Sequence, residues 1–182
     1  PVPHFSVTDT NGNTIDLDNY RGNIVVLEWT NHDCPFVKKH YGSGNMQALQ
    51  KEYTEKGIVW LSIISSAEGK QGFVSDEEAN ALTVSRNASP TAVIRDPMGG
   101  LGRTWGASTT PHMFIIDGEG ILRYMGAIDS IPSADKDDTA NADNYVRQAL
   151  DALLAGKEVP TAVTRPYGCS VKYATPSGVN DG

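Results

Sequence analysis

The chain has 182 residues, of which 39% are hydrophobic and 20% are charged, a composition typical of a compact folded protein. Its formal net charge of −7 argues against a surface for nucleic acid or anionic membranes, because such surfaces concentrate Lys and Arg. No run approaches the roughly 18 consecutive apolar residues of a membrane-spanning helix, so we expect no membrane insertion.

The first part of the chain alternates between strand and helix patterns. Alternating apolar residues on either side of residues 11–13 predict an N-terminal β-hairpin, because Asn and Gly adopt the positive φ of a tight turn. Residues 23–29 and 58–64 are almost wholly apolar, which is typical of central strands covered on both faces. Between them, apolar residues at helical spacing predict one helix over residues 35–57.

The rest of the chain continues this alternation and then ends on a strand pair and a helix. The elements that we expect are helices at 75–82 and 99–105, strands at 92–94, 111–117 and 121–125, and a helix at 140–154. This order predicts an α/β fold with a mixed central β-sheet flanked by helices on both faces. We expect a single domain over 1–182, in which 157–182 form an irregular C-terminal extension that carries Cys169.

The two cysteines are the most informative residues for chemistry. Cys34 lies where a strand pattern gives way to a helix start, with Pro35 in the first turn. Unpaired amides and the positive end of the helix dipole stabilise a thiolate there, and they lower a cysteine pKa from about 8.5 to roughly 3.5–7.5. Two cysteines are too few for a disulfide scaffold, so they are redox partners, catalytic groups or inert core residues.

Three strings of residues carry a family resemblance. They are residues 16–23 before the first central strand, 29–37 around Cys34, and 108–117 in a later strand. In this order they resemble the thioredoxin-like superfamily, and within it the redoxin branch, which includes thiol-disulfide oxidoreductases of bacterial envelopes and the AhpC/TSA peroxiredoxins. The resemblance covers about residues 3–156 and implies a thioredoxin-like fold.

The resemblance also implies roles for particular residues. Cys34 matches the nucleophilic cysteine, and Val37 stands where the second cysteine of a Cys-x-x-Cys motif would be, so no local disulfide can form. Pro111 matches the superfamily's cis-proline, whose loop, with Thr110, packs against the nucleophile and pairs with an extended substrate segment. Glu28 matches the buried strand carboxylate that accepts a proton near the nucleophile. The other expected substrate contacts lie beside the nucleophile: Pro35, Phe36 and His32.

Cys169 is the expected resolving partner of Cys34. Gly168 gives the backbone freedom to bring the two Cα atoms within the roughly 4.4–6.8 Å that a disulfide requires. A free or buried Cys169 and an inert, buried Cys34 are the alternatives.

Thiol-disulfide exchange is the activity that we expect, with Cys34 attacking a substrate disulfide, Cys169 resolving the mixed disulfide and an external thiol reducing the product. The partners are then protein or small-molecule thiols and disulfides, and no cofactor is needed. A peroxiredoxin-like thiol peroxidase acting on peroxides is the alternative, but Leu27 and Asn31 stand where peroxiredoxins carry Pro and Thr. An alternative of another class is a non-catalytic binding module with a structural Cys34–Cys169 bond.

Three histidines, His32, His40 and His112, could form a metal site with Cys34 as a thiolate ligand. The spacing matches no zinc pattern, so we expect no metal. We expect His32 and His40, like Lys38 and Lys39, to be solvated side chains. The chain begins at Pro1 rather than Met, which favours an exported compartment such as the bacterial periplasm over the cytoplasm.

Overall fold

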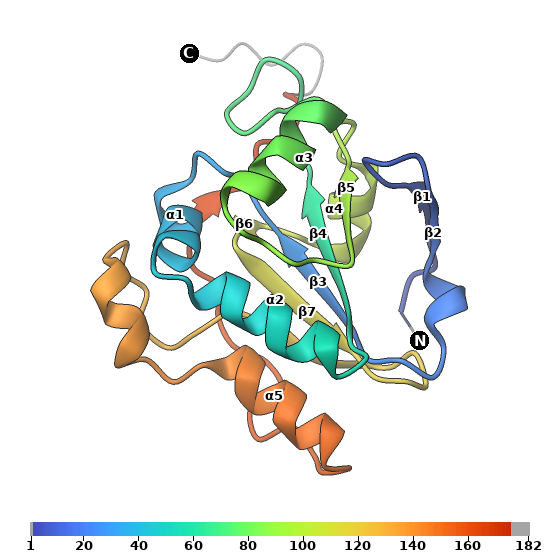
Figure 1. Ribbon diagram of the computed structural model, residues 1–182, viewed down its shortest axis with the longest axis vertical. Coiled ribbons are helices and arrows are strands. Elements are labelled where there is room, and N and C mark those ends of the chain that lie inside the picture. The colour runs from blue at the N-terminus through green and yellow to red at the C-terminus, as the bar shows by residue number, and fades with distance from the viewer. Residues whose placement is uncertain (1, 176–182) are drawn as a thin grey trace.

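A five-stranded mixed β-sheet forms the centre of the protein in the computed structural model, which describes residues 2–175 (Figure 1). Its strands are β3 (Val25–Trp29), β4 (Val59–Ile64), β5 (Ala92–Arg95), β7 (His112–Ile116) and β8 (Leu122–Gly126). They lie in the order β5-β4-β3-β7-β8, in which β5, β4 and β3 are parallel while β7 and β8 run antiparallel to their neighbours. The predicted mixed sheet is confirmed.

Helices lie on both faces of this sheet (Figure 1). They are α1 (Pro35–Gly42), α2 (Asn45–Glu55), α3 (Asp76–Ser85), α4 (Gly100–Trp105) and α5 (Tyr145–Leu154), with short 3-10 helices η1 (Leu17–Tyr20) and η2 (Lys136–Ala140). α2 contacts β4, and α5 contacts β7 and β8. None of the helices in the described part of the chain has the length and apolar character needed to cross a membrane.

The alternation of side chains along β3 creates a core on each face of the sheet. Every residue of β3 is buried, and successive side chains of a strand point to opposite faces. Val25, Leu27 and Trp29 belong to one hydrophobic core, and Val26 belongs to the other. The same alternation places Glu28 on the face of Val26, which is the face that α1, α2 and α5 cover.

The N-terminal hairpin closes the opposite core. β1 (Ser6–Thr8) and β2 (Thr14–Asp16) pair antiparallel through a turn in which Gly12 has a φ of +83°, as the sequence predicted. Apolar residues of the hairpin region and of α4 pack together on this face of the sheet: Phe5, Ile15, Leu17 and Trp105. β3 is therefore held between two separate cores.

Two helices differ from the prediction. The helix expected over residues 35–57 is divided into α1 and α2, because Gly44 adopts a left-handed conformation with a φ of +79°, which a continuing helix cannot contain. The helix expected over 140–154 begins only at Tyr145, because the Asn144 side chain caps it by accepting a backbone hydrogen bond of 2.9 Å.

The chain after α5 runs back to the carboxyl end of β3. β9 (Cys169–Ser170) pairs antiparallel with β6 (Thr109–Thr110) in a small sheet of two strands, drawn in red beside α1 in Figure 1. The predicted division into a domain and a C-terminal extension from residue 157 stays a prediction, and residues 176–182 of that extension lie outside the described residues.

Two buried histidines belong to the cores rather than to the surface. His40 on α1 is fully buried, which corrects the expectation of a solvated side chain, and burial, with a smaller contribution from the Lys39 cation, lowers its pKa to about 3. His112 on β7 is also buried, and burial lowers its pKa to about 4. Its Nδ1 accepts a 3.1 Å hydrogen bond from the Ser108 amide, which requires the neutral ring. Both rings are therefore neutral in the folded protein at pH 7.

The buried histidines should make the protein less stable in weak acid. Their folded pKa values lie below the unfolded value of about 6.5, so unfolding takes up protons between about pH 6.5 and about pH 4. As the pH falls through this range, the free energy of unfolding should fall by up to about 1.4 kcal/mol per pH unit for each histidine. Urea denaturation across the range measures the slope. His112→Gln, whose amide oxygen can still accept from Ser108, should reduce the slope, and an unchanged slope would contradict this account.

Candidate active site

Cys34 lies at the start of α1, as the sequence predicted. It is the N-cap residue, with extended backbone angles and Pro35 in the first helical position. The Lys38 amide donates to the Cys34 carbonyl at 2.9 Å and closes the first turn. The sulfur is thus next to the unpaired amides of a helix N-terminus, where a thiolate is stabilised by the helix dipole.

A disulfide joins Cys34 to Cys169. The two Cα atoms are 6.1 Å apart, within the usual range for such bonds. Cys34 is fully buried in this state, and Cys169 is partly buried against the same core. The nucleophile predicted from the sequence and its predicted partner are therefore brought together from distant parts of the chain.

The Thr110–Pro111 peptide bond is cis, and its loop packs against Cys34. Sγ of Cys34 lies 3.3 Å from the carbonyl oxygen of Thr110, which is itself buried. Thr110 is opposite Cys169 in the register of β6 and β9. The edge that the sequence assigned to an extended substrate segment is thus occupied by the protein's own β9, which sequence reasoning did not anticipate.

Glu28 is fully buried, and its carboxylate accepts four hydrogen bonds. Oε1 accepts from Trp60 Nε1 at 2.8 Å, Ser62 Oγ at 2.9 Å and Gln50 Nε2 at 3.1 Å. Oε2 accepts from the Tyr41 hydroxyl at 2.7 Å, and the Tyr41 pKa is raised by burial and by the Glu28 charge. The carboxylate is therefore directed at groups that connect α1, α2 and β4 across the core.

The remaining predicted contacts surround the start of α1. Pro35 begins the helix. The ring of Phe36 packs edge-on against the ring of Tyr167, with centroids 5.8 Å apart. His32 is partly exposed, and its Nε2 lies 3.4 Å from Oδ2 of Asp33. It lines an open cavity of about 420 Å³, and within residues 2–175 we find no contact between its side chain and the disulfide.

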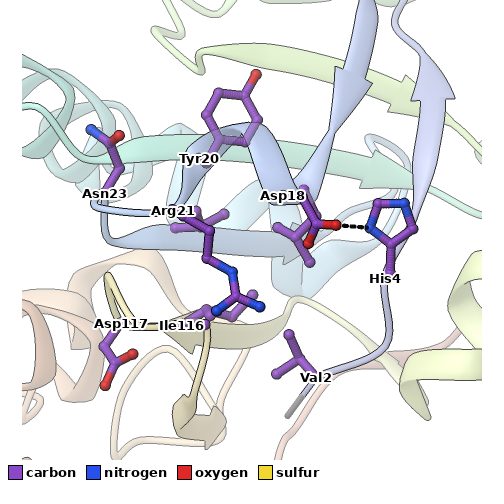
Figure 2. Close-up of a pocket in the computed structure, with 11 residues that line it drawn as sticks. Val2, His4, Asp18, Tyr20, Arg21, Asn23, Ile116 and Asp117 are labelled. Carbon is purple, nitrogen blue, oxygen red and sulfur yellow. Dashed lines mark ion pairs between the residues drawn. The ribbon is translucent and has the colours of Figure 1, made fainter.

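The histidines considered as metal ligands do not gather around Cys34. Among residues 2–175, the group of His, Cys, Asp and Glu side chains close enough to share an ion is His4, Asp16 and Asp18. Figure 2 shows His4 and Asp18 facing each other. Nδ1 of His4 and Oδ2 of Asp18 are 3.2 Å apart, and both residues line a small cavity that Val25 also lines. This group lies at the amino end of β3, the end opposite Cys34, and all three of its side chains are at least partly exposed.

Tyr167 and the side chains that bind its hydroxyl were missed by sequence reasoning. The hydroxyl meets Asp129, Lys39 and His40, all buried, so the expectation that Lys39 faces solvent is wrong. These residues come from three distant segments and form no local pattern. The position of Tyr167, two residues before Cys169, was the one available signal.

Comparison with known proteins supports the fold and identifies the family. A model of the AhpC/TSA family matches residues 1–125, whereas no curated protein sequence matches the chain. A hypothetical protein from Sinorhizobium meliloti 1021 is 22% identical, with a TM-score of 0.80 over 96% of this chain and 93% of that one. An uncharacterized conserved protein from Geobacillus kaustophilus is 25% identical, with a TM-score of 0.80 over 97% and 92%.

A more distant neighbour carries a description of its chemistry. It is a secreted Mycobacterium tuberculosis disulfide oxidoreductase homologous to E. coli DsbE, 14% identical, with a TM-score of 0.55 over 75% of this chain and 92% of that one. At this identity the likeness shows a common thioredoxin-like fold. Because the family model extends over more than half of its length, the chain belongs to the AhpC/TSA family within the thioredoxin-like redoxin superfamily.

Proposed function

We propose that the protein performs thiol-disulfide exchange, with Cys34 as nucleophile and Cys169 as the resolving cysteine. The observation that carries the proposal is the disulfide between the N-cap of α1 and β9, with 6.1 Å between the two Cα atoms. Membership of a thiol-based redox family and a fold shared with a secreted disulfide oxidoreductase support it.

The proposed cycle balances without a cofactor. The Cys34 thiolate attacks one sulfur of a substrate disulfide, whose S–S bond breaks and whose second sulfur leaves as a thiolate and takes up a proton. The Cys169 thiolate then attacks Sγ of Cys34 and releases the first substrate sulfur as a thiol. The substrate has gained two electrons and two protons, and the protein holds the Cys34–Cys169 disulfide. A thiol reductant, itself oxidised to a disulfide, regenerates the dithiol.

Access to the nucleophile requires the C-terminal extension to move; its described part, residues 157–175, is called the tail below. Cys34 is fully buried in the disulfide state, and β9 pairs with the edge of β6 beside it. An external disulfide can reach Sγ only after the Cys34–Cys169 bond is reduced and β9 leaves β6. Opening of the tail is therefore a step of the proposed cycle, and it can limit the rate.

Partners and compartment follow from this chemistry. We propose protein or small-molecule disulfides as substrates and the whole chain as a single functional unit. An exported compartment suits a disulfide that must persist between cycles, and the secreted neighbour supports that placement.

Variants at the two cysteines test the cycle. In a series of glutathione buffers, the wild-type protein should convert between the dithiol and the Cys34–Cys169 disulfide in one two-electron transition. Mass mapping measures the fraction of protein in each form. Cys169→Ser should accumulate a mixed disulfide at Cys34, because its resolving thiol is gone, and Cys34→Ser should remain unreactive toward a model disulfide.

A bond that stays oxidised in native protein under mild reductant would indicate a structural disulfide instead. Thiol loss with peroxide far faster than that of free cysteine would indicate a peroxidase.

Gly168→Ala should weaken the disulfide. Gly168 has a φ of +146°, and a Cβ there would overlap the carbonyl oxygen of Thr110, so the added methyl group would push β9 away from β6. The strain of about 1–3 kcal/mol corresponds to a roughly 5- to 150-fold shift of the thiol-disulfide equilibrium toward the dithiol. Gly156→Ala is the control, since Gly156 also has a positive φ but open space around it. Equal equilibria in the two variants would argue against the docked strand.

Glu28→Gln should lower stability while leaving exchange intact. We propose that Glu28 is a positioning residue, because its carboxylate binds structural groups. An amide can keep the bonds to Oε1, but its NH₂ group would face the Tyr41 hydroxyl that now donates to Oε2. The free energy of unfolding should fall by about 1–3 kcal/mol, measured by urea denaturation. A proton-acceptor role would instead change the pH profile of the exchange rate.

A further inference from the structure

A buried polar cluster is built around the hydroxyl of Tyr167, outside the disulfide itself. The hydroxyl donates to Oδ1 of Asp129 at 2.5 Å. It accepts from Nζ of Lys39 at 3.1 Å and lies 2.9 Å from Nε2 of His40. The side chains of Lys39 and His40 are fully buried, and only 2% of the Asp129 side chain is exposed. A hydroxyl has one donor and two acceptor positions, so Tyr167 uses all three.

The hydrogen bonds assign the protons within this cluster. Nδ1 of His40 is 2.9 Å from the side-chain amide of Asn45, which can donate to it, so the proton of the neutral ring is on Nε2 and points at Tyr167. Burial raises the pKa of Tyr167, which therefore remains a phenol that can donate to Asp129. Burial lowers the pKa of Lys39 and raises that of Asp129, while the attraction between the two groups acts in the opposite direction on each. Their nitrogen and oxygen are 3.9 Å apart and are joined through the Tyr167 hydroxyl.

The cluster connects the nucleophile's helix to the resolving cysteine's strand. Lys39 and His40 belong to α1, whose N-cap is Cys34, and Asp129 follows β8. Tyr167 stands two residues before Cys169, which begins β9. The contacts with Lys39 and His40 therefore help to fix Cys169 relative to the helix that Cys34 caps, and the bond to Asp129 ties the same strand to the segment after β8.

We propose that Tyr167 is the positioning residue that keeps the Cys169 strand docked beside Cys34 when both cysteines are reduced. This inference rests on the proposed exchange function, which it deepens by naming what holds the resolving cysteine in reach. The docked tail then has two effects: it presents Cys169 for resolution, and it shields the Cys34 thiol from solvent until the tail opens.

The hydroxyl acts on the docking equilibrium for a physical reason. When the tail opens, water can replace the Tyr167 hydroxyl on Asp129, Lys39 and His40. When Tyr167→Phe is docked, water is excluded and the same three buried groups each lose a partner, although the ring contact with Phe36 is kept. Removing the hydroxyl therefore penalises the docked state and leaves the open state unchanged.

Alkylation of Cys34 measures how often the tail opens. In full-length Cys169→Ala protein under reductant-free conditions, Cys34 is the one cysteine left for iodoacetamide, and it is buried while the tail is docked. Adding Tyr167→Phe should accelerate alkylation about 10- to 100-fold, the change expected on losing hydrogen bonds to charged groups. When the alkylation rate is plotted against pH, the acceleration should raise the plateau that the curve reaches at high pH. A change in the pKa of the Cys34 thiol alone would instead move only the pH at the midpoint of that curve.

Tyr53→Phe is a matched control. The ring of Tyr53 is buried in the same core, and its hydroxyl also donates to a carboxylate at 2.5 Å, but that carboxylate is Oδ1 of the exposed Asp151 on α5 and not part of the tail. This variant should alkylate within about twofold of the parent protein. Equal rates for Tyr167→Phe and the parent, or equal acceleration by both tyrosine variants, would overturn the proposal.

Hydrogen exchange gives a second measurement that needs no variant at residue 167. The Val171 amide donates to the Ser108 carbonyl at 3.1 Å next to β9. In reduced wild-type protein this amide should stay protected, because the tail remains docked; rapid exchange would overturn the proposal. Both experiments report docking whether or not the protein turns over a substrate, so failure of this inference is distinguishable from failure of the exchange function.

Discussion

The pairing of β9 with β6 places Cys169 opposite Thr110, whose carbonyl oxygen contacts Sγ of Cys34. The cis bond before Pro111 shapes the loop that presents this carbonyl. Cys34 itself is the N-cap of α1. The helix start, the proline loop and the returning tail thus meet at one sulfur atom. The resemblance to thioredoxin-like proteins led us to expect an extended substrate segment along the proline loop, and β9 occupies that edge instead.

The tail is held from both faces of the sheet. Tyr167 and Cys169 pack against the core that α1, α2 and α5 cover, whereas Val171 and Tyr173 pack against the opposite core beside α4. The backbone between them crosses the carboxyl end of β3, where β9 forms. The two anchors therefore hold β9 from both of its ends, and Gly168 lies between Tyr167 and the pairing with Thr110.

The sequence predicted those parts of the site that depend on local patterns and missed those that depend on tertiary contacts. The apolar runs marked β3 and β4, and Pro35 marked the helix start at Cys34. A strand of two residues such as β9 has no periodicity to detect, so the occupation of β6 by the tail could not be seen. Lys39 has the sequence setting of a solvated charge, but its partners Asp129 and Tyr167 lie about 90 and 130 residues further along the chain. Buried ionic groups need such partners, and only the fold reveals that they are present.

The distance in sequence between the two cysteines has a thermodynamic consequence. The disulfide closes a loop with a sequence separation of 135, which in an unfolded chain would cost several kcal/mol of entropy. The packed sheet and its two cores already bring most of that loop to a fixed geometry. Within the described residues, the segment left to order is 155–175, which follows the end of α5 at Leu154. Under the proposed exchange cycle, the redox equilibrium is therefore governed by how firmly a short tail docks rather than by the length of the loop, and the proposed contacts of Tyr167 tune it without altering either cysteine.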